Sequence, residues 1–196
     1  MVSKRLSRDD RRAQLLAVAL DVVRDEGVDA LTLARVAERA GVSKPIAYDH
    51  FVTRTGLLAA IYLDYDQRQT TALETALARG GTTLDRVADI LANACVECAL
   101  DAGPEVLAVT AALEGSAEME AMLQSCRANL MTVFGRALEP FGLRPGAAFT
   151  AAFTAVLASL EALSRAVCAG SISRDTATAT LKTIILAVAA APPPDA

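Results

Sequence analysis

The amino-acid sequence predicts an all-α fold of about nine helices, with an N-terminal three-helix domain followed by a larger C-terminal helical domain. Alanine and leucine dominate the 196 residues, only 4% are aromatic and tryptophan is absent, a composition that favours helices over strands. Hydrophobic residues make up 53% of the chain, which is enough to bury a sizeable core. The apolar residues recur at helical spacing in segments that glycine and proline separate.

The first two helices have recognisable starts and ends. Ser7 and Asp10 have the spacing of a capping box, so we expect the first helix to begin at Ser7 and to end at Gly27. A short second helix fits residues 33–40, with Thr32 as its N-cap.

A three-residue turn, Gly41-Val42-Ser43, is expected to follow the second helix. Glycine can adopt the left-handed conformation that a tight turn needs, and Ser43 can cap a third helix. Pro45 falls in the first turn of that helix, where its missing N–H costs nothing, and the helix should reach about Phe51. Two short helices joined in this way predict a helix-turn-helix, whose second helix enters the major groove of DNA.

Six further helices are expected beyond this motif. Thr53 can cap the fourth helix, which should run to about Leu77 and stop at Gly80-Gly81. The others are predicted at residues 84–100, 104–113, 118–138, 145–168 and 174–190.

The charge is distributed unevenly, although the net charge of the whole chain is −4. Residues 1–54 hold ten Lys and Arg against eight Asp and Glu, whereas the remainder holds nine against fifteen. A basic N-terminal part on an acidic body is typical of a DNA-binding domain joined to a domain with another role. We therefore predict a DNA-binding domain at 1–54, a ligand-binding and dimerisation domain at 55–191, and a disordered tail at 192–196.

The third helix exposes more side chains than it can bury. Ala47 and Phe51, four residues apart, form the packing face. Lys44 is placed to reach base edges or phosphate, and Tyr48 and His50 can donate hydrogen bonds to phosphate oxygens.

Residues 8–58 resemble the DNA-binding domain of the TetR family of bacterial repressors. The resemblance rests on Gly27, Ala30-Leu31-Thr32, Val36-Ala37, Gly41-Val42-Ser43, Tyr48-Asp49-His50-Phe51, Arg54 and Leu57-Leu58. It implies that Lys44, Pro45 and Ile46 contact bases, and that Arg54 replaces a lysine usual in the family. The DNA-binding residues expected on this basis are Thr32, Ser43, Lys44, Pro45, Ile46, Tyr48, His50 and Arg54. It further implies a homodimer on a roughly palindromic double-stranded operator.

Some of these residues have other interpretations. Asp49 could accept a hydrogen bond from a cytosine amino group or be a solvated charge at the helix end. His50 could be a core histidine, and Tyr48 could pack on the first helix. Lys44 could contact phosphate without selecting a base, or be a solvent-exposed charge.

The C-terminal helices indicate dimerisation and a ligand. Residues 145–168 and 174–190 carry many small side chains, which permit close helix approach, so we expect the homodimer to form through these last two long helices; an ordinary core helix is the alternative. The middle helices are aliphatic with methionine, which suits a small, largely apolar effector. The ligand-binding residues are not identified, although Glu97, Glu114 and Gln124 are possible polar partners.

Cys95 and Cys98 form a C-x-x-C on one helical face. An alternative function is therefore that of a sensor of oxidants or metal. Zinc would need two further ligands, so we predict no metal site and no cofactor. We also predict that the protein is not an enzyme, because the sequence has no phosphate-binding loop or nucleophile–histidine pair.

The chain is expected to be cytoplasmic and not to associate with a membrane. Its beginning is basic, without the apolar segment of a signal peptide, and the apolar stretch 147–160 is shorter than the roughly 20 residues a bilayer requires. The predicted function is that of a repressor that its ligand releases from DNA. A ligand-independent or activating regulator is the alternative with the same fold.

Overall fold

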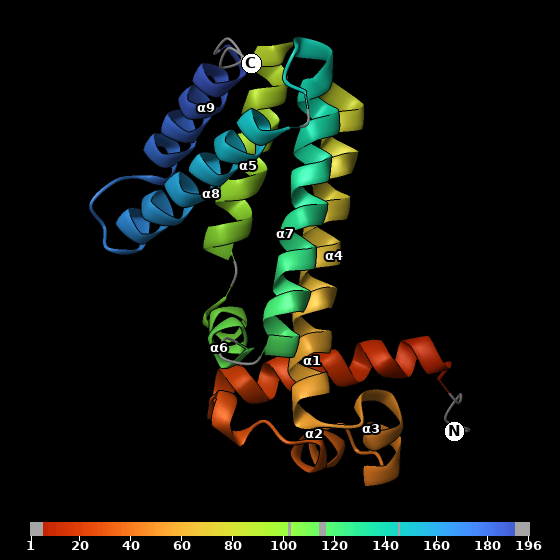
Figure 1. Ribbon diagram of the computed structural model, residues 1–196. Helices are drawn as coiled ribbons and strands as arrows, with labels where there is room; N and C mark the ends of the chain where they lie inside the picture. Colours follow the sequence, from red (N-terminus) through yellow and green to blue (C-terminus); the bar gives the residue numbers. More distant parts are fainter. Residues whose placement is uncertain (1–5, 102, 114–116, 145, 191–196) are drawn as a thin grey trace. The chain divides into compact units, whose positions relative to one another are not determined.

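The computed structural model describes residues 6–101, 103–113, 117–144 and 146–190, which form nine α-helices and two short 3₁₀ helices (Figure 1). The α-helices are α1 (Arg8–Glu26), α2 (Leu33–Arg39), α3 (Lys44–Phe51), α4 (Arg54–Gly80), α5 (Leu84–Asp101), α6 (Pro104–Leu113), α7 (Ala117–Leu138), α8 (Ala147–Cys168) and α9 (Arg174–Ala190). The 3₁₀ helices are η1 (Val28–Ala30) and η2 (Glu139–Phe141). The predicted all-α fold is confirmed, whereas the two 3₁₀ helices were not predicted.

The helix starts follow from short polar side chains. The Ser7 Oγ accepts a hydrogen bond from the Asp10 amide at 3.0 Å, and the Thr32 Oγ1 accepts one from the Arg35 amide at 3.1 Å. Ser43 is the N-cap residue of α3, as predicted, and takes the extended N-cap conformation, but its side chain forms no capping hydrogen bond. Its hydroxyl stays on the exposed surface at the start of α3.

The chain divides into two units, which we call the head and the body. The head comprises residues up to Asp66 together with 102–123, and the body comprises Gln67–Asp101 and the residues from Gln124 onward. Both α4 and α7 therefore contribute one part to each unit. Glu114 and the predicted tail 192–196 lie outside the described residues.

The core of the head joins every helix that contributes to this unit. Leu15 and Val22 of α1, Val36 of α2, Phe51 of α3 and Leu57 of α4 are among its buried residues, and α6 and α7 complete it. Because α2 and α3 pack on each other and on this core, the helix-turn-helix is held on a fixed support.

In the body, α5, α8 and α9 pack against one another, and α4 and α7 contribute further core residues (Figure 1). The Phe134 and Phe153 rings meet edge to face at a centroid distance of 5.4 Å, and the Phe149 ring stacks near Phe153 at 6.3 Å. A cavity of about 10 Å³ remains beside these rings. The core of the body is therefore closely packed.

The sequence prediction of no membrane span depended on the short apolar stretch at 147–160. The helix α8 extends beyond this stretch, with 22 residues in all. Among the described helices it alone has the length and composition to cross a membrane, and 17% of its most apolar window is buried. Phe149, Phe153 and Val156 form its buried face. Its other face is a stripe of exposed residues that includes Ala151, Ala155, Ala158 and Ala162.

Candidate nucleic-acid interface

The turn between α2 and α3 is built from backbone hydrogen bonds. Gly41 has a φ of 67°, and its amide donates to the Glu38 carbonyl at 3.1 Å. The Val42 amide donates to the Ala37 carbonyl at 3.0 Å. The turn thereby closes α2 and sets the direction in which α3 begins, as a helix-turn-helix requires.

On α3 the structure separates a buried face from an exposed one. Ala47 and Phe51 are buried, as predicted, and Tyr48 is 49% exposed. Ile46 is half-buried against the core of the head. The predicted contact residues that are fully on the surface are Thr32, Ser43, Lys44, Pro45 and Tyr48. Four of these five accessible side chains are polar, and Ser43, Lys44 and Pro45 lie at the start of α3.

The Arg54 guanidinium is not freely exposed to bind phosphate, because it already binds the protein backbone. Its Nε donates to the Leu31 carbonyl at 2.9 Å and its Nη2 to the Val28 carbonyl at 2.7 Å. The guanidinium is half-buried and holds the 3₁₀ helix η1 against the start of α4. Any DNA contact by Arg54 therefore has to use its remaining N–H groups.

His50 is half-buried, with its ring 5.9 Å from the Phe51 ring. Burial is the main cause that lowers the pKa of His50, and the positive charges of Arg8 and Arg12 lower it further. The imidazole is accordingly neutral near pH 7. A neutral imidazole can still donate one N–H to a phosphate oxygen.

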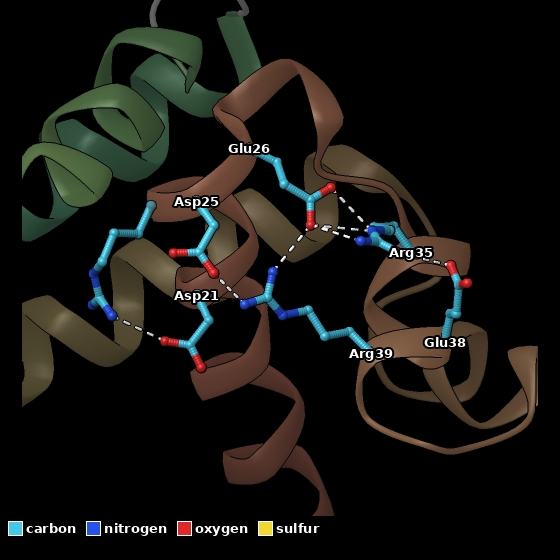
Figure 2. Close-up of polar contacts among 7 residues, drawn as sticks. Asp21, Asp25, Glu26, Arg35, Glu38 and Arg39 are labelled. Carbon is cyan, nitrogen blue, oxygen red and sulfur yellow. Dashed lines mark hydrogen bonds and ion pairs between the residues drawn. The ribbon is translucent and has the colours of Figure 1, made fainter.

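An ion-pair network fixes α2 on the end of α1 (Figure 2). Glu26 lies between two arginines, with its Oε1 2.9 Å from the Arg35 Nη2 and 3.0 Å from the Arg39 Nη1. Arg35 also pairs with Glu38 at 2.9 Å, and Arg39 also pairs with Asp25. The hydrogen bond from Arg35 is the main cause that lowers the pKa of Glu26.

This network was not predicted from the sequence. Only the Arg35–Glu38 pair has the local i, i+3 spacing that could have signalled it. Because Arg35 and Arg39 are occupied by carboxylates, they add little free positive charge to the interface.

The link between α3 and α4 contains a strained residue. Val52 has φ 60° and ψ −52°, and the Thr53 amide donates to the Phe51 carbonyl at 2.6 Å, which together define the rare positive-φ form of the γ-turn. A Cβ on Gly56 would overlap the Phe51 carbonyl oxygen, so glycine is needed there for the close approach. The Val52 side chain is 72% exposed, so packing does not offset the strain.

Replacing Val52 by glycine is expected to raise the free energy of unfolding by about 1 kcal/mol. Strain of this kind costs about 1–3 kcal/mol, and the greater entropy of unfolded glycine offsets part of the gain. Urea denaturation measures the difference. Val52→Ala is the matched control, because alanine keeps the Cβ and should give a much smaller gain. A Val52→Gly protein less stable than wild type would contradict the strained turn.

Neither cysteine of the C-x-x-C sequence is on the open surface. Cys95 is buried and Cys98 is half-buried, and burial raises the pKa of Cys95 to about 12. The thiolate is the form that reacts with oxidants and binds metal, so this environment disfavours both. The described residues contain no group of three or more His, Cys, Asp and Glu side chains placed to hold a metal ion.

A cleft of about 330 Å³ lies between the body segment of α4 and α5. Leu73, Ile90, Asn93 and Glu97 are among the residues that line it. Glu97, one of the predicted polar partners for a ligand, is therefore at this cleft, whereas Gln124 is on the exposed surface of α7.

The N-terminal part of the head matches proteins of known family. Residues 15–61 match the family model described as bacterial regulatory proteins of the tetR family. Over 57 residues, the chain is 47% identical to the HTH-type transcriptional activator FasR of Mycolicibacterium smegmatis, a match that covers 29% of this chain and 26% of FasR.

A longer match joins the chain to the nucleoid occlusion factor SlmA of Haemophilus influenzae, at 29% identity over 147 residues, which are 71% of this chain and 65% of SlmA. The chain thus spans less than two thirds of the length of both relatives. The fold resembles the crystal structure of the fatty acid degradation regulator FadR from Bacillus halodurans, with a TM-score of 0.70 and 15% identity over 94% of this chain and 96% of that one. The match over residues 15–61 shows that the N-terminal domain of this chain is that of the TetR family of bacterial regulatory proteins.

Proposed function

We propose that this protein is a homodimeric, sequence-specific DNA-binding transcriptional repressor of the cytoplasm that a small, largely apolar ligand releases from its operator. One observation carries the DNA-binding part of this proposal. The helix α3 is anchored by buried Ala47 and Phe51 and presents Lys44, Pro45 and Tyr48 on the surface. A recognition helix needs this division between a packed face and an accessible face.

The proposed contacts follow from the chemistry of the exposed groups. Lys44 and Pro45 approach base edges together with the half-buried Ile46, and the Lys44 ammonium can reach a guanine or a phosphate. The hydroxyls of Ser43 and Tyr48 donate to phosphate oxygens. Thr32, His50 and Arg54 complete the proposed set, with Arg54 chiefly holding η1 in place.

We propose that two copies associate through α8 and α9, in the region 55–191 that we assign to ligand binding and dimerisation. The exposed alanine stripe of α8 supports this proposal. Thr183 and Ala187 add small exposed side chains on α9. Small residues allow close contact between helices, and a two-fold dimer matches a palindromic operator.

The proposed ligand is apolar or amphipathic, because the interior of the body is aliphatic and aromatic. The 10 Å³ cavity is far smaller than the roughly 300–1,000 Å³ of a typical ligand pocket. Ligand entry therefore requires the body core to open, or the ligand uses the cleft that Glu97 lines. The name of FadR, a fatty acid degradation regulator, is in keeping with an apolar effector class.

Selection of random DNA duplexes on the purified protein tests this function. A two-fold symmetric site should emerge. Fluorescence anisotropy on that site should show about 10-fold or more weaker binding for Lys44→Ala, since a good contact to a base edge is worth about 1–3 kcal/mol. Tyr48→Ala should also weaken binding, because it removes a proposed phosphate contact. Tyr48→Phe isolates the hydroxyl. Arg79→Ala, on the exposed surface of the body, is a control that also removes one positive charge.

The outcomes separate the parts of the proposal. If no duplex is enriched at low and at moderate salt, the DNA-binding function is wrong. If the selected site binds but reporter expression rises with the protein present, the protein is an activator, as the name of FasR states for that relative. If fatty acids or other apolar molecules leave the complex intact, the proposed ligand class is wrong.

A further inference from the structure

The arginines of the head fall into two groups. Arg24, Arg35 and Arg39 each pair with at least two carboxylates, and Arg54 donates to backbone carbonyls. Their charges are thus locally compensated or directed inward. Such side chains contribute little to the binding of an external anion.

The remaining described arginines, Arg8, Arg11 and Arg12, lie on the first turns of α1. Their i, i+3 and i+4 spacing places them on the same side of the helix as the buried Leu15. In the described part of the head, none of them forms an ion pair with a carboxylate; Arg11 donates to the amide oxygen of Gln14 at 2.6 Å. Among the described arginines of the head, those without a carboxylate partner are therefore concentrated here.

Arg12 connects this face of α1 to the end of the proposed recognition helix. Its guanidinium carbon lies 5.2 Å from the centre of the Phe51 ring, a cation–π arrangement. Phe51 is the last residue of α3 and is buried. Arg12 is thus held beside α3 by a specific contact, and Arg8 and Arg11 lie on the same side of α1.

The electrostatic environment of His50 supports the same placement. After burial, the charges of Arg8 and Arg12 are the largest causes that lower the pKa of His50, and Arg11 lowers it as well. Asp49 opposes them. The positive potential of the α1 face therefore reaches the side of α3 that carries His50.

The acidic residues of the same turn do not cancel this potential. Asp10 accepts a hydrogen bond from the Ser7 hydroxyl at 2.7 Å and lies on the opposite side of α1 from Arg8. Asp9 flanks the basic face and is exposed. Both carboxylates also interact with the positive N-terminal end of the helix dipole, so their negative charge is not directed at the arginines alone.

We propose that Arg8, Arg11 and Arg12 form a second phosphate-binding surface for double-stranded DNA, which contacts the backbone beside the segment that α3 reads. The proposal rests on the DNA-binding function proposed above and adds residues of α1 to it. Phosphate contacts hold the protein on the duplex and carry no sequence information. The basic α1 face therefore contributes to affinity and its salt dependence, and α3 contributes specificity.

The test compares wild type with the double variant Arg8→Gln/Arg11→Gln on the selected operator and on a scrambled duplex. Each phosphate contact contributes about 0.9 to the slope of log affinity against log salt concentration. The double variant should lower the magnitude of this slope by about 2 per head. Its affinity for both duplexes should fall by the same factor, about tenfold or more. Arg8→Lys/Arg11→Lys keeps the charge and should keep the slope.

Arg79→Gln/Arg136→Gln is the matched control, because both arginines are exposed on the body and their loss changes the net charge equally. It should leave the slope unchanged. An unchanged slope in the Arg8→Gln/Arg11→Gln protein, or a loss confined to the operator, overturns the α1 surface while the DNA-binding function stands. Failure of the wild type to bind either duplex overturns the function itself.

The single histidine of the chain gives a second measurement that needs no DNA. Proton NMR resolves the titration of His50 directly. The pKa of His50 should rise toward its ordinary value in the Arg8→Gln/Arg11→Gln protein, because two positive charges that disfavour the imidazolium are removed. An unchanged titration in a folded variant would mean that these arginines do not lie beside α3.

Discussion

Replacing Ala155 by arginine is expected to yield a monomer and to weaken operator binding by about 10²–10⁴-fold. Ala155 is exposed in the middle of α8, with the exposed Ala151 and Ala158 one turn to either side. If a second copy packs on this stripe, each copy would place a long charged side chain in a contact suited to methyl groups. The affinity falls because two linked heads bind a palindrome with an avidity of this order.

Sedimentation analysis and fluorescence anisotropy check the two parts of this prediction. Ala128→Arg, at an exposed alanine of α7, is the matched control and should remain a dimer with wild-type affinity. The variant should still bind a half-site weakly, since its head is unchanged. A stable dimer of the Ala155→Arg protein would exclude this stripe of α8 as the interface.

The positions of the helices could be predicted from the sequence because their signals are local. The capping serine at 7, the capping threonine at 32 and the glycine at 41 act within four residues of their own positions. The two 3₁₀ helices were missed since three residues carry no apolar period. Ser43 is at the predicted N-cap position, but its hydroxyl forms no capping hydrogen bond, because residue type alone does not determine which partner a hydroxyl binds.

Contacts between residues far apart in the chain could not be predicted from the sequence. Arg54 resembles a DNA-contacting lysine of the family, yet its guanidinium binds carbonyls 23 and 26 positions earlier in the chain. The pairing of Glu26 with Arg35 and Arg39 likewise depends on how α1 and α2 pack. A valine with positive φ is also unexpected, because Val52 has none of the freedom that glycine offers.

The division of α3 into a buried and an exposed face could be predicted from the sequence. Exposed Lys44 and Tyr48 alternate with buried Ala47 and Phe51 within a single short helix, so periodicity alone assigns the two faces. The α1 arginines were missed because their relevance depends on the contact between Arg12 and Phe51, which joins two helices.

Phe134→Ala is expected to lower the free energy of unfolding of the body by about 3–5 kcal/mol, as measured by urea denaturation. Phe134 is 2% exposed and meets the Phe153 ring edge to face. The neighbouring cavity is only about 10 Å³, so removal of the ring leaves a space that the surrounding side chains do not fill. Phe141→Ala, at a half-buried position, should cost less.

A loss below about 1 kcal/mol for Phe134→Ala would contradict a rigidly packed body, since a cost that small requires the core to close round the vacated space. The expected loss has a consequence for the proposed ligand. A body that resists collapse can keep the space left by Phe134, and apolar cavities of this kind bind small apolar molecules. Stabilisation of the Phe134→Ala protein by benzene, absent in wild type, would show that the core can hold an apolar guest only after it has been opened.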